Sequence, residues 1–146
     1  GDLVVRDFGA VIDGYRSDMT RSMRIGGTGS GPAADLLAVV LEAQAAGLAA
    51  VVDGVPASEV DKACRSVLLE AGLGEAFSHG TGHGVGLDIH EGPAVASTAT
   101  GSLRSGQVVT VEPGAYVAGL GGVRWEDTVL VTDDGHRSLT GFPKAL

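Results

Sequence analysis

Residues 3–25 read LVVRDFGAVIDGYRSDMTRSMRI, which is two strand-like runs joined by Asp13 and Gly14. An Asp-Gly pair between such runs is a strong signal for a β-hairpin with a two-residue turn. With this turn, Asp7 pairs with Thr20 on the opposite strand. We assign no chemical role to Thr20. The sequence therefore predicts an antiparallel hairpin whose strands carry acids among apolar residues.

The same hairpin brings two carboxylates to one face. In this register Gly9 faces Asp18, and Asp7 lies diagonal to Asp18, at a separation of roughly 7–8 Å between their backbones. Gly9 has no side chain, so we expect open space over that face. Carboxylates that reach into this space from Asp7 and Asp18 are suited to share a cation.

A second acidic hairpin is predicted further along the chain. Residues 108–112 read VVTVE and residues 123–132 read VRWEDTVLVT, with a glycine-rich turn region between them. A turn centred near Gly119 places Glu112 opposite Glu126. Acidic residues often just flank turns, but two pairs on otherwise apolar strands are harder to explain as solvated surface. The two hairpins indicate a weak internal duplication.

Residues beside Glu126 divide between the two faces of its strand. By the two-residue period, Arg124 and Thr128 share the face of Glu126, while Trp125 points to the opposite side and into packing. Four other polar residues are predicted to be surface or turn positions: Asp13, Asp88, Asp127 and His136.

A loop rich in histidine and glycine supplies the third element. Residues 78–93 read SHGTGHGVGLDIHEGP and contain His79, His83 and His90. Glycine lets the backbone turn sharply and approach a ligand closely, and imidazole binds metals or moves protons near neutral pH. A lone histidine would more often be structural, whereas three beside two acidic hairpins favour a site.

Five side chains form the candidate metal set: Asp7, Asp18, His83, Glu112 and Glu126. All are oxygen or imidazole donors, which suit two divalent cations such as Mn²⁺, Co²⁺ or Zn²⁺ better than a sulfur-rich zinc site. Four carboxylates brought together without cations would oppose each other's ionisation. Two neighbouring metals usually indicate hydrolysis by an activated water.

Two helices are expected between the hairpins. Residues 32–52 form an apolar, alanine-rich helical stripe, too short and interrupted for a confident membrane span. A second helix begins with Ser58 as its N-cap and ends at Gly72. Both helices should cover the outer face of the sheet and keep the hairpins rigid.

Composition excludes some classes of partner. The 146 residues suffice for one domain with a core, and the net charge of −8 argues against nucleic acid, whose phosphates require a basic face. Cys64 is the single cysteine and is expected as a packed thiol. The absence of a disulfide framework fits a cytoplasmic location. No membrane partner is expected.

Four motifs together resemble the pita-bread metallopeptidases (family M24), and within them the Xaa-Pro branch of prolidase and aminopeptidase P. The resemblance implies an α+β fold with a curved antiparallel sheet and helices on its outer face. The motifs occur in the family's order. They are DFGA at 7–10 with GYRSDMTR at 14–21, HGTGHGVGLDIHEGP at 79–93, VEPG at 111–114 and VRWEDT at 123–128.

The resemblance implies a role for each ligand. Asp7 would chelate one metal, Asp18 and Glu126 would bridge both, and His83 and Glu112 would complete the second. A water or hydroxide between the metals would attack the scissile carbonyl. Manganese is expected first, with cobalt or zinc as alternatives.

Further residues would act on the substrate or on the ligands. Glu112 would pass the proton of the water to the leaving proline nitrogen. His90 resembles the histidine that contacts the substrate carbonyl or oxyanion, and His79 resembles the one that lines the proline-side pocket. Arg124 would hold a bridging carboxylate in place.

The resemblance covers residues 1–146 and matches the C-terminal portion of the catalytic domain. In the family, further helices and strands precede the first metal strand. We therefore expect an N-terminally truncated chain whose full-length parent is a homodimer. The implied partner is a proline-containing peptide.

Other members of the fold compete with this interpretation. Methionine aminopeptidase is the nearest alternative enzyme, but residues 112–116 (EPGAY) and 123–127 (VRWED) fit the Xaa-Pro branch better. A creatinase-like hydrolase does not need the metals, and non-catalytic peptide-binding modules usually lose ligands. Five intact ligand positions count against both. Metal identity and substrate length stay open.

Overall fold

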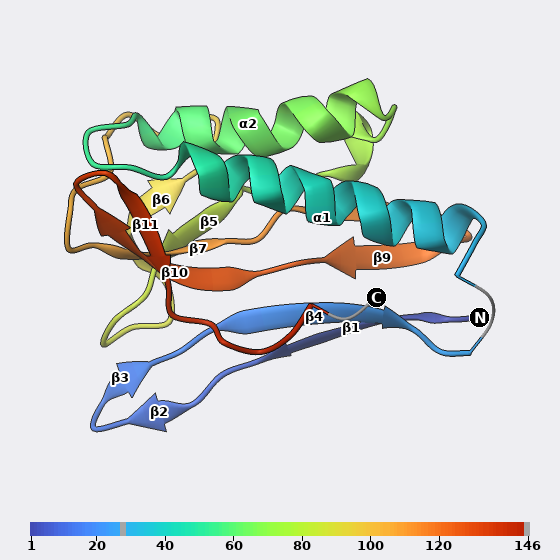
Figure 1. The fold of residues 1–146 in the computed structure, drawn as a ribbon, viewed down its shortest axis with the longest axis horizontal. Helices are drawn as coiled ribbons and strands as arrows, with labels where there is room; N and C mark the ends of the chain where they lie inside the picture. The colour runs from blue at the N-terminus through green and yellow to red at the C-terminus, as the bar shows by residue number, and fades with distance from the viewer. Residues whose placement is uncertain (27–28, 145–146) are drawn as a thin grey trace.

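The first 25 residues or so form a long two-stranded ribbon that turns at Asp13-Gly14 and lies below the rest of the fold in Figure 1. The computed structural model describes residues 1–26 and 29–144, so residues 27–28 and 145–146 of the predicted 1–146 portion lie outside the described residues. Asp13 and Gly14 have φ values of 52° and 89°, as a primed hairpin turn requires. Asp7 pairs with Thr20, as predicted. The ribbon consists of β1 (Leu3–Phe8), β2 (Val11–Ile12), β3 (Tyr15–Arg16) and β4 (Met19–Arg24).

Gly9 does not leave open space, so that prediction was wrong. A Cβ atom at Gly9 would lie 1.8 Å from the backbone oxygen of Ser17. Ser17 and Ala10 exchange hydrogen bonds at this point, with Ser17 N donating to Ala10 O and Ala10 N donating to Ser17 Oγ, both at 3.0 Å. Gly9 lies between β1 and β2. Glycine is needed there because the returning chain at Ser17 passes too close to leave room for a side chain.

The second hairpin forms in the predicted register. Val111 pairs with Asp127 and Gly114 pairs with Arg124, so Glu112 and Glu126 stand opposite each other between these pairs. The lower part of this hairpin, β7 and β10, belongs to a five-stranded sheet in the order β11-β10-β7-β5-β6. Its part nearer the turn, β8 and β9, forms a separate two-stranded sheet. The strands are β5 (Gly82–Gly84), β6 (Glu91–Val95), β7 (Val108–Val111), β8 (Gly114–Val117), β9 (Gly121–Arg124), β10 (Asp127–Thr132) and β11 (Gly135–Ser138).

Within the described part of the chain, a backbone bridge joins the two hairpins. Glu126 N donates to Thr20 O at 3.2 Å, and the two residues form an isolated antiparallel bridge outside the named strand pairs. This contact connects the ribbon to the five-stranded sheet (Figure 1). It places the acidic positions of both hairpins beside each other.

Two helices cover the sheet on the side away from the ribbon, as Figure 1 shows. They are α1 (Pro32–Ala50) and α2 (Ala57–Glu70), and a short 3₁₀ helix, η1 (Gly74–Ala76), follows. The predicted N-cap was wrong, because Pro56 occupies that position and Ser58 lies within the first turn. Gly72 ends α2 with a φ of 74°, as predicted.

The core lies between the helices and the sheet. Trp125 is fully buried, and its Nε1 donates to Leu37 O of α1 at 3.0 Å, so its predicted place in packing is confirmed. Cys64 is buried on α2 as predicted, and burial raises the pKa of its thiol to about 12. The thiol is therefore neutral and acts as a packed apolar group.

Helix α1 begins at Pro32 as predicted and ends at Ala50, two residues before the predicted end at residue 52. By length and composition its 19 residues, with a mean hydropathy of 1.5, are sufficient to cross a membrane. Leu36, Val40 and Ala43 are instead buried in the core of the fold. A core helix passes the same test of length and composition, so we draw no membrane association from it.

Replacing Trp125 with Ala should lower the free energy of unfolding by about 3–5 kcal/mol, because the change empties a large buried volume and removes the bond to α1. Chemical denaturation of both proteins measures the difference. Ile12→Ala is the matched control, since Ile12 is 71% exposed at the tip of the ribbon. A loss below about 1 kcal/mol for Trp125→Ala would contradict this role.

Candidate metal centre

Three ligand atoms from distant parts of the chain converge where the ribbon meets the five-stranded sheet. One atom each from Asp18, His83 and Glu126 lies within 4.8 Å of the others. Asp18 directly precedes β4, His83 lies on β5, and Glu126 forms the bridge before β10. His83 Nε2 is 3.7 Å from Asp18 Oδ2 and 3.1 Å from Glu112 Oε1. Four of the five predicted ligands are therefore together.

Asp7 lies at the edge of this group. It lines a cleft of about 400 Å³ together with Asp18 and His90. Its carboxylate Oδ2 accepts a short hydrogen bond from Arg124 Nη2, and its side chain is 52% exposed. Asp7 thus faces the predicted site, but its oxygen is turned to the guanidinium and it is not one of the three converging residues.

The hydrogen bonds of His83 determine which nitrogen it presents to the carboxylates. His83 Nδ1 is 3.0 Å from Gly84 O, which can only accept, so Nδ1 carries the proton. Nε2 is therefore the nitrogen that faces Glu112 and Asp18: protonated, it donates to Glu112 Oε1, and deprotonated, it offers its lone pair to a cation. Thr110 Oγ1 supports this arrangement, since it accepts from His83 N at 3.0 Å and donates to Glu112 Oε1 at 2.9 Å.

The crowded carboxylates have shifted pKa values. Burial, followed by the negative charge of Asp7, raises the pKa of Asp18. Burial also raises the pKa of Glu126 to about 8, with the charge of Glu112 as the next cause. Both shifts mean that the site holds negative charge at a cost. A bound cation would remove that cost.

His83 and Glu112 are coupled in the opposite sense. Burial alone would lower the pKa of His83, but the hydrogen bond to Glu112 outweighs it and the pKa is raised. Burial alone would raise the pKa of Glu112, but its bonds with His83 and Thr110 lower it. The ion pair thus favours the charged form of both partners, in contrast to Asp18 and Glu126.

Thr20 belongs to the site, although the sequence analysis gave it no role. Its hydroxyl donates to Glu126 Oε2 at 2.6 Å and accepts from Arg124 Nε at 3.1 Å. Arg124 therefore reaches Glu126 through Thr20 and bonds directly to Asp7, not to a predicted bridging carboxylate. The two-residue period from Asp18 to Thr20 could have identified this residue.

The predicted histidines line the neighbouring cleft. His79 Nδ1 is 2.8 Å from Gly80 O and therefore carries the proton, so the hydroxyl of Tyr116 donates to His79 Nε2 at 3.0 Å. Tyr116, which the sequence analysis missed, also accepts from Arg124 Nη1 at 3.3 Å. The ring of His90 packs 4.2 Å from that of His83 between centroids. His79, His83 and His90 share a cleft of about 270 Å³ with Glu112 and Arg124.

Asp127 was predicted to be a surface or turn residue, and this was wrong. It is buried, and its carboxylate pairs with Arg21 Nη2 at 2.8 Å and closely with Lys144. Arg21 Nη1 also donates to Glu126 O at 2.6 Å. Strand alternation turns Asp127 to the face opposite Glu126. On that face, Arg21 bonds both the Asp127 carboxylate and the backbone oxygen of Glu126.

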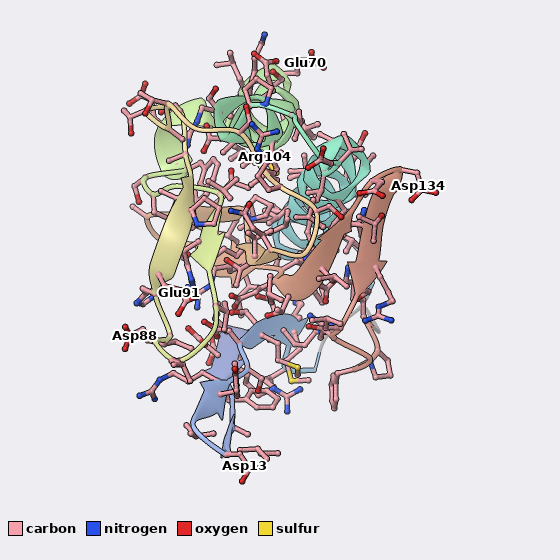
Figure 2. The ribbon with its side chains drawn as sticks, turned by 90° about the vertical axis from the view of Figure 1, so that its left-hand side faces the viewer. Asp13, Glu70, Asp88, Glu91, Arg104 and Asp134 are labelled. Carbon is pink, nitrogen blue, oxygen red and sulfur yellow. The ribbon has the colours of Figure 1, made fainter. Side chains whose placement is uncertain are left out.

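The other predicted surface positions are confirmed. Asp13, Asp88 and His136 are exposed. Figure 2 shows Asp13 at the tip of the ribbon and Asp88 on the loop that follows β5. That loop rests on the ribbon, because Arg16 donates from N to Gly86 O at 2.8 Å and from Nε to Leu87 O at 3.0 Å.

The donor set fits hard or borderline divalent cations. Its members offer carboxylate oxygens and one imidazole nitrogen, which suit Mn²⁺, Co²⁺ or Zn²⁺. Thr20, Thr110 and Arg124 orient the carboxylates through hydrogen bonds, as outer partners do around protein metal sites.

Removing the ionisable group of Glu126 should change how the metal-free protein responds to pH. The folded pKa of about 8 exceeds the ordinary 4.5, so the folded state holds a proton that the unfolded state releases over this window. Stability of the metal-free protein should therefore fall as pH rises through the window. In EDTA, Glu126→Gln should unfold at a higher temperature than the wild type near pH 9, with a smaller gap near pH 5.

Glu70→Gln is the control for this experiment, because Glu70 is exposed at the end of α2, far from the ribbon in Figure 2. It should follow the wild type at each pH. Parallel pH profiles for Glu126→Gln and the wild type would contradict the assignment of a desolvated Glu126 carboxyl.

Comparison with known proteins places this geometry in a family. The model of metallopeptidase family M24 matches residues 1–133. The Xaa-Pro dipeptidase of Pyrococcus horikoshii is 44% identical over 146 residues, which are 100% of this chain and 41% of that protein. The chain therefore spans about two fifths of the length of this curated relative.

Solved structures agree with the sequence relationship. The Xaa-Pro dipeptidase from Bacillus anthracis superimposes with a TM-score of 0.95 at 44% identity, over 99% of this chain and 40% of that one. The X-Pro aminopeptidase from Thermotoga maritima gives a TM-score of 0.93 at 38% identity, over 98% and 40% of the two chains. The chain belongs to metallopeptidase family M24 and has its pita-bread fold.

Proposed function

We propose that this chain carries the catalytic centre of a peptidase that hydrolyses Xaa-Pro bonds with two divalent metal ions. The observation that carries the proposal is the convergence of Asp18, His83 and Glu126 within 4.8 Å, with Glu112 3.1 Å from His83. Asp7 lines the adjoining cleft. The names of the relatives, Xaa-Pro dipeptidase and X-Pro aminopeptidase, support the bond type.

The five side chains divide the work of holding two cations. Asp18 and Glu126 would hold both cations, Asp7 would bind one of them, and His83 with Glu112 would bind the other. When bound, two cations lower the pKa of water and polarise the scissile carbonyl. Manganese is the first candidate, because carboxylates form most of the donor set.

Glu112 moves the proton in this proposal. In the metal-free protein, hydrogen bonds with His83 and Thr110 lower the pKa of its carboxyl. With metals bound, the Thr110 bond and the cations would keep Glu112 ionised and able to accept a proton from water. It then donates that proton to the leaving proline nitrogen. The carboxylate returns to its ionised form when the amine leaves.

The substrate lies in the cleft between the histidines. His90, exposed beside His83, is available to donate to the carbonyl oxygen as negative charge develops on it. His79, fixed by Gly80 and Tyr116, lines the side that receives proline. Arg124 holds Asp7 directly and Glu126 through Thr20.

The 146-residue protein should cleave an Ala-Pro dipeptide or an Ala-Pro-containing tripeptide when Mn²⁺ is supplied. Cleavage of only the dipeptide would indicate a dipeptidase, and cleavage of the tripeptide would indicate an aminopeptidase. Asp18→Ala should reduce kcat/KM by at least about a thousandfold, because it removes a bridging oxygen. Free proline released over time is the measurement.

Asp134→Ala is the matched control, since Asp134 lies on the turn between β10 and β11, far from the ribbon (Figure 2). Its activity should equal that of the wild type. Full activity of Asp18→Ala would overturn the bridging role. Absence of cleavage by a folded, Mn²⁺-saturated wild type would overturn the proposal that this chain carries a complete centre.

A further inference from the structure

Helix α2 bonds directly to the backbone segment that carries His79. Arg65 Nη1 donates to Phe77 O and Arg65 Nη2 donates to His79 O, both at 3.0 Å. The guanidinium also lies 4.2 Å from the centre of the Phe77 ring, and that ring meets the His79 ring edge-on at 5.0 Å. One side chain of the helix thus contacts the segment through both its backbone and its rings.

Asp61 fixes the position of Arg65. The two form a bidentate pair one helical turn apart, with Arg65 Nε 2.9 Å from Asp61 Oδ2 and Arg65 Nη2 3.0 Å from Oδ1. The Asp61 side chain is fully buried, and its Oδ1 also accepts from Thr81 Oγ1 at 3.0 Å. A buried, bidentate carboxylate restricts the guanidinium to one orientation. Asp61 and Arg65 together therefore hold both ends of residues 77–81.

This segment has little regular structure of its own. It connects η1 to β5, and its residues lie outside the named helices and strands. Thr81 O accepts from Glu112 N at 2.7 Å, so the far end of the segment is tied to the metal side of the site. The end with His79 depends on Arg65 for both of the carbonyl bonds described above. A displacement there would move the His79 ring relative to Tyr116.

We propose that Arg65, oriented by Asp61, is a positioning residue that sets the His79 imidazole in the substrate cleft. The proposal rests on the proposed function, in which His79 lines the proline side. Two donors of the guanidinium are directed at the carbonyls of Phe77 and His79, so the ion pair contacts the backbone that carries the His79 ring. Arg65 touches neither the substrate nor the metals, so its effect passes through His79.

The first test is Arg65→Lys in the Mn²⁺-loaded protein. Lysine keeps the charge beside Asp61 and avoids a buried unpaired carboxylate, but its single ammonium cannot reproduce the planar fork. We expect the KM for Ala-Pro to rise about tenfold, kcat to change less than about twofold, and the Mn²⁺ concentration for half-maximal activity to stay constant. Arg104→Lys, at an exposed arginine on the loop before β7, should match the wild type.

A double-mutant cycle separates positioning from general destabilisation. If Arg65 acts through His79, Arg65→Lys should change KM by less than about twofold in a His79→Ala background. The same tenfold change in both backgrounds would overturn the proposal. The proposal would also be overturned if kcat fell, KM rose and the Mn²⁺ concentration for half-maximal activity rose by similar factors. That pattern is expected of a purely structural ion pair.

A second readout does not depend on activity. In histidine ¹H–¹⁵N spectra, wild-type His79 should show the tautomer with its proton on Nδ1, and Arg65→Lys should shift this signal while His136 stays unchanged. An unshifted His79 signal would overturn the proposal. If Arg65→Lys shifts the His79 signal as expected but the wild type cleaves neither the dipeptide nor the tripeptide, the proposed function is refuted while the positioning role stays supported.

Discussion

The contact between Thr20 and Glu126 is the constraint on which the rest of the site depends. The backbone bond between them joins the ribbon to the five-stranded sheet, and the hydroxyl of Thr20 bonds to the Glu126 carboxylate at 2.6 Å. Each hairpin alone places two acids on one face. Only their junction brings acids from both hairpins to the same point, and Arg21 fixes that junction from behind by bonding Glu126 O.

The assembled site is costly to the metal-free protein. Burial and mutual repulsion raise the pKa values of Asp18 and Glu126, so folding must hold groups that resist ionisation. The helices and the Trp125 core supply the rigidity that keeps these carboxylates together. Cations bound at the site would convert this unfavourable arrangement into a favourable one, which links metal binding to stability.

Much of this arrangement could be predicted from the sequence, because turn chemistry determines strand register. Asp13-Gly14 correctly set Asp7 opposite Thr20, and the glycine-rich turn set Glu112 opposite Glu126. Contacts between distant segments could not be predicted in this way. Asp127 became a buried partner of Arg21, and Gly9 proved to be a close-approach position, since both depend on which strand lies alongside. The metal roles of the five ligands stay predictions.

The central claim is that two hairpins together bind two metal ions, and the stoichiometry of Mn²⁺ binding tests it most directly. Calorimetric titration of the metal-free protein, with electron paramagnetic resonance of the product, measures both the number of ions and their proximity. The account predicts two Mn²⁺ ions per chain with the spectrum of a magnetically coupled pair. A single bound ion, or two ions without magnetic coupling, would contradict it.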